Sequence, residues 1–308
     1  MENQIDNIIK NAYISIFDTN LDVIKKLSLI NTKCLIDNYK QRYIYIDNNR
    51  LRDELKYYRF YGNEYKSENI LNIFLPVILS NNNGEKCETE LIELVKKYVM
   101  YLKIDEKYTE YVIATLVYNE VVHLILKNSK VEYQEVMDKI KEKVISINIP
   151  MEKKEVVKFQ MYRINLIKTI DDYKDMNRNS NNDICTNLFD AIFDIYVEER
   201  KENNDIESIK KVLFSLLGQN TSTEIENTDF INSMAEYLIK LKKYKINKKE
   251  YNNISNPLEI ISLNEGETAK NPILNKITIK SKKINGNLLK IDVLSKSGEY
   301  CFKFLKKN

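Results

Sequence analysis

Residues 277–304 read ITIKSKKINGNLLKIDVLSKSGEYCFKF, and this stretch decides how the fold is divided. Three runs in it alternate apolar and polar residues: 277–280, 289–293 and 300–304. The pairs Asn285-Gly286 and Ser297-Gly298 stand between the runs, and both are typical of tight hairpin turns. The pattern therefore predicts a small C-terminal three-stranded antiparallel β-meander.

The alternation also predicts two unlike faces for this sheet. One face would be aliphatic and aromatic, with Ile279, Ile291 and Phe302 buried against the rest of the protein. The other would carry lysines: Lys280, Lys282, Lys290, Lys296 and Lys303. Lys280, Lys290 and Lys303 are candidate contacts for a polyanion or nucleic acid, for acidic lipids, or for the acidic surface of the chain itself. The aromatic residues fall on the apolar face, which differs from an RNA-recognition sheet.

The charge of the chain is divided in the same way. Of the overall net charge of +3, residues 1–239 contribute −7 and residues 240–308 contribute +10. Lysine richness itself is weak evidence for a site. With 41 Lys against 7 Arg and abundant Asn and Ile, the composition is typical of an AT-rich bacterial genome. The basic C-terminal segment and an acidic body together constrain which partners the protein can bind.

Upstream of the sheet, apolar residues recur at helical spacing. Only six Gly and four Pro interrupt the chain, which favours long helices. Pro76 should kink or end one of them. We therefore predict a mainly α protein: a multi-helix globular body over residues 1–250, and a basic β-meander over 251–308 that packs on it. The expected helices cover 5–16, 23–35, 49–59, 70–80, 88–102, 106–126, 132–145, 151–173, 183–199, 205–217 and 228–244.

Several classes of protein are disfavoured by what the sequence lacks. There is no P-loop, dinucleotide fingerprint, kinase motif set, zincin or EF-hand pattern. The four cysteines are scattered, which suggests reduced thiols and a cytoplasmic location. The N-terminus does not resemble a signal peptide, and no apolar run is long enough to predict a transmembrane segment.

Residues 39–66 combine arginine and tyrosine more densely than the rest of the chain. Guanidinium groups bind phosphates and carboxylates, and aromatic faces stack on bases or form protein–protein hot spots. Acidic residues reduce the charge of this segment to about +3, which is weak for nucleic acid. The segment is compatible with ordinary packing and intramolecular pairing, with a protein interface, and with binding of a nucleotide or nucleic acid. The candidate binding residues are Arg42, Arg50, Arg52, Tyr57, Tyr58 and Arg59. Our first hypothesis is a non-catalytic cytoplasmic interaction protein with a protein partner and no cofactor.

A second hypothesis rests on Asp171, Asp172 and Asp175. Their D-D-x-x-D spacing resembles the motif with which class I prenyl-diphosphate enzymes hold Mg²⁺. The resemblance implies a Mg²⁺-dependent enzyme acting on a diphosphate, with Arg178 nearby to balance phosphate charge. The alternative is a solvated helix end followed by an acidic surface stripe. That stripe consists of Asp183, Asn187, Asp190, Asp194 and Glu198.

The only histidine, His123, follows Glu120 in an E-x-x-H pair. Di-iron helical bundles need two such pairs, and a second histidine does not exist in this chain. We therefore interpret the pair as part of a polar helix stripe or as a hydrogen-bonded interior histidine.

Overall fold

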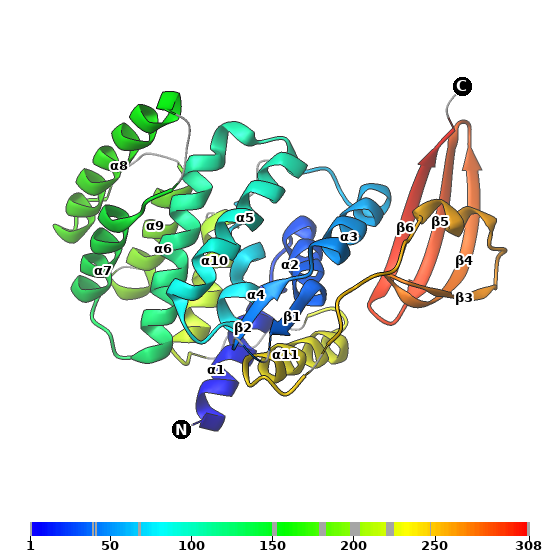
Figure 1. The fold of residues 1–308 in the computed structure, drawn as a ribbon, viewed down its shortest axis with the longest axis horizontal. Helices are drawn as coiled ribbons and strands as arrows, with labels where there is room; N and C mark the ends of the chain where they lie inside the picture. Colours follow the sequence, from blue (N-terminus) through cyan, green and yellow to red (C-terminus); the bar gives the residue numbers. More distant parts are fainter. Residues whose placement is uncertain are drawn as a thin grey trace.

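The structure is a computed structural model that describes residues 2–38, 40, 42–66, 69–149, 153–178, 183–197, 204–219, 225–246 and 248–306. It is mainly helical, with a small antiparallel sheet at the C-terminal end (Figure 1). The α-helices are α1 (Glu2–Ser15), α2 (Asp22–Cys34), α3 (Asn48–Tyr61), α4 (Leu71–Ser80), α5 (Gly84–Leu102), α6 (Tyr108–Lys127), α7 (Tyr133–Ser146), α8 (Lys153–Lys174), α9 (Ile184–Tyr196), α10 (Asn204–Leu216) and α11 (Thr228–Lys242). Two 3₁₀ helices, η1 (Asp105–Lys107) and η2 (Pro257–Ser262), complete the helical elements of the described residues.

The centre of the helical body is built on α4 and α6. Every residue of α4 is buried, and most of α6 is buried as well. Pro76 was expected to kink or end the first of these helices, but α4 continues through it. A proline cannot donate to the carbonyl four residues earlier. That carbonyl, of Asn72, instead accepts a hydrogen bond of 3.2 Å from Ser28 Oγ on α2. The neighbouring helix thus satisfies the group that Pro76 leaves open.

A short hairpin between α2 and α3 was missed by the sequence analysis. Strand β1 (Leu35–Asn38) pairs with β2 (Tyr43–Ile46), although residue 35 was expected to end a helix. The Asn81 side chain, which follows α4, accepts from Ile44 N and donates to Ile44 O, each at 3.1 Å. Each strand has only four residues, and a two-stranded ribbon is marginal alone. Contact with the helical body therefore holds this hairpin in place.

The C-terminal sheet has four strands in the order β3-β4-β5-β6, which corrects the prediction of three. They are β3 (Thr268–Asn271), β4 (Asn275–Asn285), β5 (Leu288–Ser295) and β6 (Gly298–Leu305). Both predicted hairpins are present, at 285–288 and 295–298. The missed strand, β3, is a run of Thr, Ala, Lys and Asn with no apolar alternation. It exists because the Asn271 side chain accepts from Ile273 N and Leu274 N and so closes a tight turn onto β4.

The apolar face of the sheet lies against α3, on the side of the helical body (Figure 1). Ile279, Ile291 and Phe302 are at most 1% exposed. The Phe302 ring meets Tyr57 and Tyr61 of α3 at centroid distances of 6.2 and 5.3 Å. Such tilted and edge-on contacts add to the area that the rings bury. Among the described residues, no helix has the length and apolar character needed to cross a membrane.

This contact predicts that the sheet and the helical body stabilise one another. Replacing Phe302 by Ala removes a fully buried ring, and such changes cost about 3–5 kcal/mol of unfolding free energy. Leu305→Ala is the matched control, because Leu305 is 78% exposed on the same strand. We expect denaturant unfolding to show a large loss for Phe302→Ala and a change within about 0.5 kcal/mol for the control. Equal stability of the two variants would show that the sheet does not depend on α3.

Candidate functional site

The site begins with the acidic residues of α3, which point into the protein. Asp47 caps the helix, since its side chain accepts from the backbone N–H groups of Asn49 and Arg50. Asp53 and Glu54 are 1% and 0% exposed. Glu54 Oε2 accepts a 2.7 Å hydrogen bond from Lys33 Nζ of α2. A buried carboxylate without such a partner would destabilise the fold, so these contacts fix the orientation of α3.

The Asp53 carboxylate has hydrogen-bond partners both in the interior and at the surface of the protein. Its Oδ2 accepts from Ser255 Oγ at 3.1 Å, and its Oδ1 accepts from Lys56 Nζ at 2.9 Å and from Arg52 Nε at 3.3 Å. Burial raises the pKa of Asp53, but the hydrogen bonds from Lys56, Ser255 and Arg52 outweigh it and lower the pKa below its usual value. One carboxylate therefore faces two cations that both reach the solvent.

These cations border a groove of about 550 Å³ between α3 and α5. Its charged lining residues are all basic, and leucine, methionine and tyrosine side chains form its apolar part. Arg52 and Lys56 keep side-chain exposures of 59% and 47% despite their contact with Asp53. The lining residues are Asn48, Leu51, Arg52, Leu55, Lys56, Arg59, Lys97, Met100 and Tyr101. The groove thus combines an apolar floor with an excess of positive charge.

Contacts between the two helices hold the groove residues in position. Lys97 Nζ of α5 donates to Asn48 Oδ1 of α3 at 2.6 Å, and Tyr101 Oη donates to Leu55 O at 3.1 Å. The Arg59 guanidinium lies 5.5 Å from the centroid of the Tyr101 ring, in a cation–π arrangement. Burial raises the pKa of Tyr101 to about 12, so its hydroxyl remains a donor at neutral pH. The groove is therefore formed before any ligand arrives.

The groove continues past Arg59 and Tyr101 into a second depression of about 630 Å³. This depression adds Tyr65, Leu102 and Lys103, along with Glu64, and runs over the C-terminal end of α3. The concave surface therefore follows α3 from Asn48 to beyond Tyr61, a length of about 20 Å at 1.5 Å per helical residue. An extended segment or a helix of several turns would fit along it.

The structure brings together two of the six candidate residues in segment 39–66. Arg52 and Arg59 line the groove, whereas Tyr57 and Tyr58 are 0% and 3% exposed and belong to the core. The Arg50 Nη2 atom faces the buried Glu54 at 3.5 Å. Arg42 lies in the β1–β2 loop with a φ of 49°, and its carbonyl accepts from Tyr244 Oη. The predicted surface is therefore smaller than the segment, and Tyr57 and Tyr58 contribute mainly to the core.

Sequence reasoning missed several lining residues of the groove. Arg52, Lys56 and Arg59 are spaced i, i+4 and i+7, so this stripe of α3 could have been found from the sequence. Lys97, Met100 and Tyr101 lie on α5, and only the packing of α5 against α3 brings them to the groove. The contribution of α5 to the site could therefore be recognised only from the three-dimensional structure.

The lysines of the sheet are only partly brought together. Lys290 and Lys303 are direct cross-strand partners, and Lys283 of β4 lies opposite Lys290 on its other side. Lys280 sits instead at an irregularity of β4, between Ile279 and Ser281, and its amino group forms an ion pair with Glu299. Lys282, which was expected on the same face, is paired with the buried Ile291 and donates to Ile261 O at 2.7 Å.

The three aspartates of the D-D-x-x-D motif lie at the C-terminal end of α8. Asp171 Oδ1 and Oδ2 both accept from Lys141 Nζ, at 2.6 and 2.8 Å, while Asp172 and Asp175 are exposed. Within the described ranges, no three His, Cys, Asp or Glu side chains converge as metal ligands would. The structure therefore gives Asp171 a salt bridge and leaves Asp172 and Asp175 exposed to solvent.

The stripe that follows, on α9, was expected to be solvated and is instead largely internal. Asp183 caps α9, and Asp194 is 6% exposed. Arg178 Nε donates to Asp190 Oδ1 at 2.7 Å, and Arg178 Nη2 pairs with Asp194. Lys210 of α10 lies 3.5 Å from the other oxygen of Asp194. These charges join α9 and α10 to the segment that follows α8. The last expected member of the stripe, Glu198, lies outside the described residues.

His123 is partly buried, and its environment differs from the expected one. Its Nε2 atom is enclosed and has no hydrogen-bond partner among the described residues. Burial, with a smaller contribution from Lys242, lowers the pKa of His123 to about 4. The imidazole is therefore neutral at neutral pH. Among the described residues, the Nε2 atom therefore lacks the hydrogen bond that was expected for an interior histidine.

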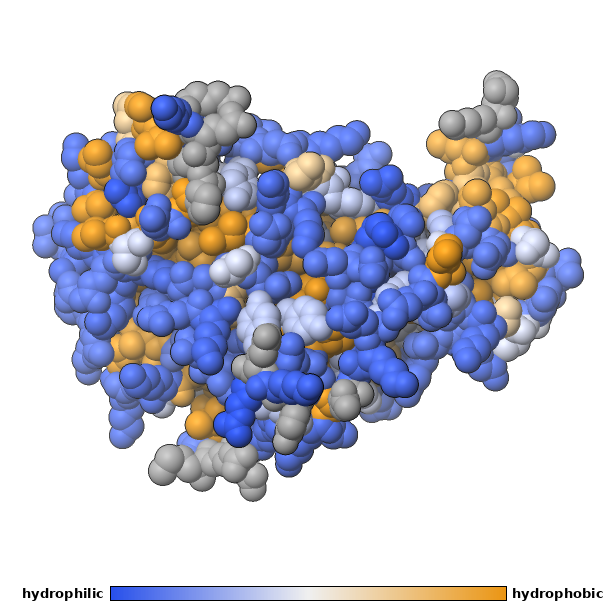
Figure 2. Space-filling model, in the orientation of Figure 1, coloured by the Kyte–Doolittle hydropathy of each residue, from blue (hydrophilic) through white to orange (hydrophobic). Residues whose placement is uncertain are grey.

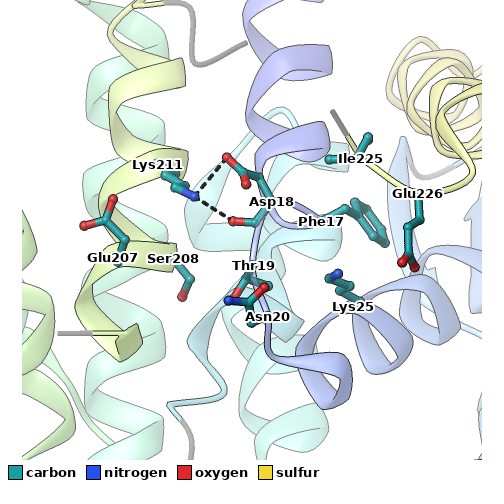
Figure 3. A pocket seen from close by; sticks show the side chains of 10 residues that line it. All are labelled: Phe17, Asp18, Thr19, Asn20, Lys25, Glu207, Ser208, Lys211, Ile225 and Glu226. Carbon is teal, nitrogen blue, oxygen red and sulfur yellow. Dashed lines mark hydrogen bonds and ion pairs between the residues drawn. The ribbon is translucent and has the colours of Figure 1, made fainter. Parts of the chain in front are cut away.

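Another concavity, of about 420 Å³, lies between the end of α1, the helix α10 and the residues before α11 (Figure 3). Lys211 Nζ crosses it to reach the carboxylate and the carbonyl of Asp18, at 3.0 and 3.1 Å. Lys25, Glu207 and Glu226 also line it. Its lysines share the pocket with carboxylates, so it lacks the one-sided charge of the α3–α5 groove.

Comparison with known proteins finds no matching family model, no matching curated protein and no matching solved structure. The function has to be argued from the geometry of the chain itself. The α3–α5 groove is the candidate site, because its lining combines apolar surface with four basic side chains, of which Arg52 and Lys56 share the single Asp53 carboxylate.

The burial of the α9 stripe predicts unequal effects of two aspartate substitutions. Asp194→Ala withdraws a carboxylate from two cations that are themselves 12% and 4% exposed, which costs about 3–5 kcal/mol. Asp172→Ala is the matched control, because Asp172 is exposed at a helix end. We expect thermal unfolding to show a marked loss for the first variant and little change for the second. Similar losses of thermal stability in the two variants would contradict the description of Asp194 as buried and paired and of Asp172 as exposed.

Proposed function

We propose that the protein is a non-catalytic binding protein that holds an acidic segment of a partner protein in the α3–α5 groove. One observation carries the proposal. Four basic side chains surround an apolar floor, and the Asp53 carboxylate, which pairs with Arg52 and Lys56, offsets only part of their charge. An acidic amphipathic segment would complement both features, because its apolar residues would cover Met100 and Tyr101 while its carboxylates would reach the cations.

The energetics favour such a segment over a small anion. Rim charges in water contribute mainly to association rate and selectivity, whereas burial of apolar area supplies most of the affinity. Met100 is 59% exposed and so leaves apolar surface in the groove for a partner to cover. Methionine and arginine are also enriched at protein interfaces. The length of the groove supports a peptide rather than a single phosphate group.

The same residues argue against nucleic acid as the occupant of the groove. Single-stranded nucleic acids bind by stacking bases on exposed aromatic rings. Tyr57 and Tyr58 are buried, and the Tyr101 ring is already paired with the Arg59 guanidinium. Catalysis has no support in the groove either. Its lining contains no His, Cys, Asp or Glu that could act as a nucleophile or general base.

A direct test uses a fluorescently labelled peptide of about 16 residues. Its leucines follow helical spacing, and glutamates occupy the remaining positions. We expect the full-length protein to bind it and the double variant Arg52→Glu/Arg59→Glu to bind at least tenfold more weakly, because reversed charges repel the glutamates. Fluorescence anisotropy titrations at two salt concentrations measure the affinity. Met100→Ala should weaken binding with little change in salt dependence.

The control is Lys127→Glu/Lys130→Glu, which reverses two exposed lysines between α6 and α7. If the control weakens binding as much as the groove variant, net charge and not the groove explains the affinity. Binding that is unchanged in Arg52→Glu/Arg59→Glu would contradict the proposal outright. Circular dichroism spectra of all variants show that they are folded.

A further inference from the structure

The free end of the C-terminal sheet carries a row of three lysines. Lys283 of β4, Lys290 of β5 and Lys303 of β6 are consecutive cross-strand partners, and all three are exposed. Directly opposed residues in an antiparallel sheet have Cβ atoms about 5 Å apart, so like charges there destabilise the sheet. The sheet also has one opposed lysine pair at its other edge, Lys270 and Lys276. At the row, however, three neighbouring strands each contribute a lysine, and an anionic ligand would offset their repulsion.

The irregularity at Lys280 creates this row. Without it, strict alternation from Ile279 would place Lys280 and Lys282 on the outer face. The register shift between Ile279 and Ser281 turns Lys282 to the inner side and Lys283 outward, opposite Lys290. The nearest outward residues along the strands are less basic. Asp292 accepts from Ser281 Oγ at 2.7 Å, and its pKa is lowered by hydrogen bonds from Ser281 and Cys301 and by Lys283 and Lys290, so it offsets part of the charge of the row. Lys280 pairs with Glu299.

Exposed aliphatic side chains lie immediately beyond the lysine row. Leu305 pairs with Leu288 on the same outward face, whereas Ile284, just before the β4–β5 turn, pairs with Leu289 and projects from the opposite face of this end of the sheet. Ile284 and Leu305 are 79% and 78% exposed, among the most exposed large apolar residues that are described. Figure 2 shows this apolar patch at the end of the sheet that points away from the helical body. We call Lys283, Lys290, Lys303, Ile284, Leu288 and Leu305 the sheet tip.

From this arrangement we infer that the sheet tip binds the surface of a membrane that contains anionic lipids. Lysines attract acidic headgroups, and aliphatic side chains at the same edge enter the boundary between headgroups and acyl chains. Nucleic acid fits less well, because the aromatic residues Tyr300, Phe302 and Phe304 are at most 7% exposed and cannot stack on bases. The inference does not depend on the α3–α5 groove, which uses other residues.

The test measures co-sedimentation of the full-length protein with two kinds of vesicle: pure phosphatidylcholine, and phosphatidylcholine with 30% phosphatidylserine. We expect binding to the anionic vesicles alone. Reversing the row in Lys283→Glu/Lys290→Glu/Lys303→Glu should weaken that binding about 100-fold, given the known contribution of each basic residue near such a surface. Ile284→Ser/Leu305→Ser should weaken it several-fold and leave the remaining binding more sensitive to salt.

The matched control is Lys270→Glu/Lys276→Glu, which reverses another cross-strand lysine pair of the same sheet, away from the tip. Anionic-vesicle binding that falls equally in the control and in the row variant would overturn the inference, since general charge would then suffice. So would binding that does not change in Ile284→Ser/Leu305→Ser. A single-stranded 20-nucleotide DNA that binds tightly through the lysine row, while anionic vesicles do not bind, would assign the row to nucleic acid and reject the membrane. Thermal unfolding of each variant confirms that the sheet is intact.

Discussion

The structure depends on the burial of three carboxylates on one side of α3. Asp47, Asp53 and Glu54 are nearly inaccessible to water, and each obtains its partner from a different segment or segment end. Glu54 binds Lys33 of α2, Asp53 binds Ser255, and Asp47 Oδ2 accepts from Tyr251 N at 2.5 Å. Removing one member of such a buried pair leaves a charge without compensation. Helix α2, helix α3 and the chain that leads to the sheet are therefore fixed relative to one another.

The connection after α11 is held by a further buried charge. Lys248 Nζ donates to the carbonyls of Lys33 and Leu35, at 2.7 and 3.3 Å, near the end of α2. Burial lowers the pKa of Lys248 to about 8. The ammonium thus binds a carbonyl in the last turn of α2, where positive charge is favourable, and the first carbonyl of β1, which also accepts from Tyr237 Oη. This contact and those of Tyr251 and Ser255 position the chain, so that the sheet reaches Tyr57 and Tyr61 on α3.

These constraints separate charges that are mixed in the sequence. Between residues 39 and 66, acidic residues offset part of the positive charge of the sequence. In the structure, however, the acids Asp47, Asp53 and Glu54 are buried. The basic residues Arg52, Lys56 and Arg59 are exposed to solvent. The surface is consequently more basic than the composition of the segment suggests. Helix α3 uses one side for the aromatic contact with the sheet and another for the groove with α5. A periodic sequence indicates an amphipathic helix, but the side on which the acids are buried depends on α2 and residues 251–255.

Local periodicity predicted much of the fold. Helical spacing indicated the helices of the body, and the two turn pairs located both later hairpins of the sheet. Strand β3 and the β1–β2 hairpin were missed because each strand has four residues and depends on distant side chains such as Asn81. For the site, the sequence supplied Arg52 and Arg59 but not Lys97 or Met100. The D-D-x-x-D motif suggested a metal site from spacing alone, but spacing does not reveal that Asp171 pairs with Lys141.

The central claim, that the α3–α5 groove is where an acidic partner segment binds, is tested most directly by hydrogen–deuterium exchange. Exchange of the full-length protein is compared with and without the leucine–glutamate peptide, and the location of protection is read along the chain. The account predicts slower exchange in the parts of α3 and α5 that border the groove, residues 48–62 and 97–103, with little change in β4–β6. Protection confined to the sheet or to the pocket beside Lys211, with none in α3 and α5, would contradict it.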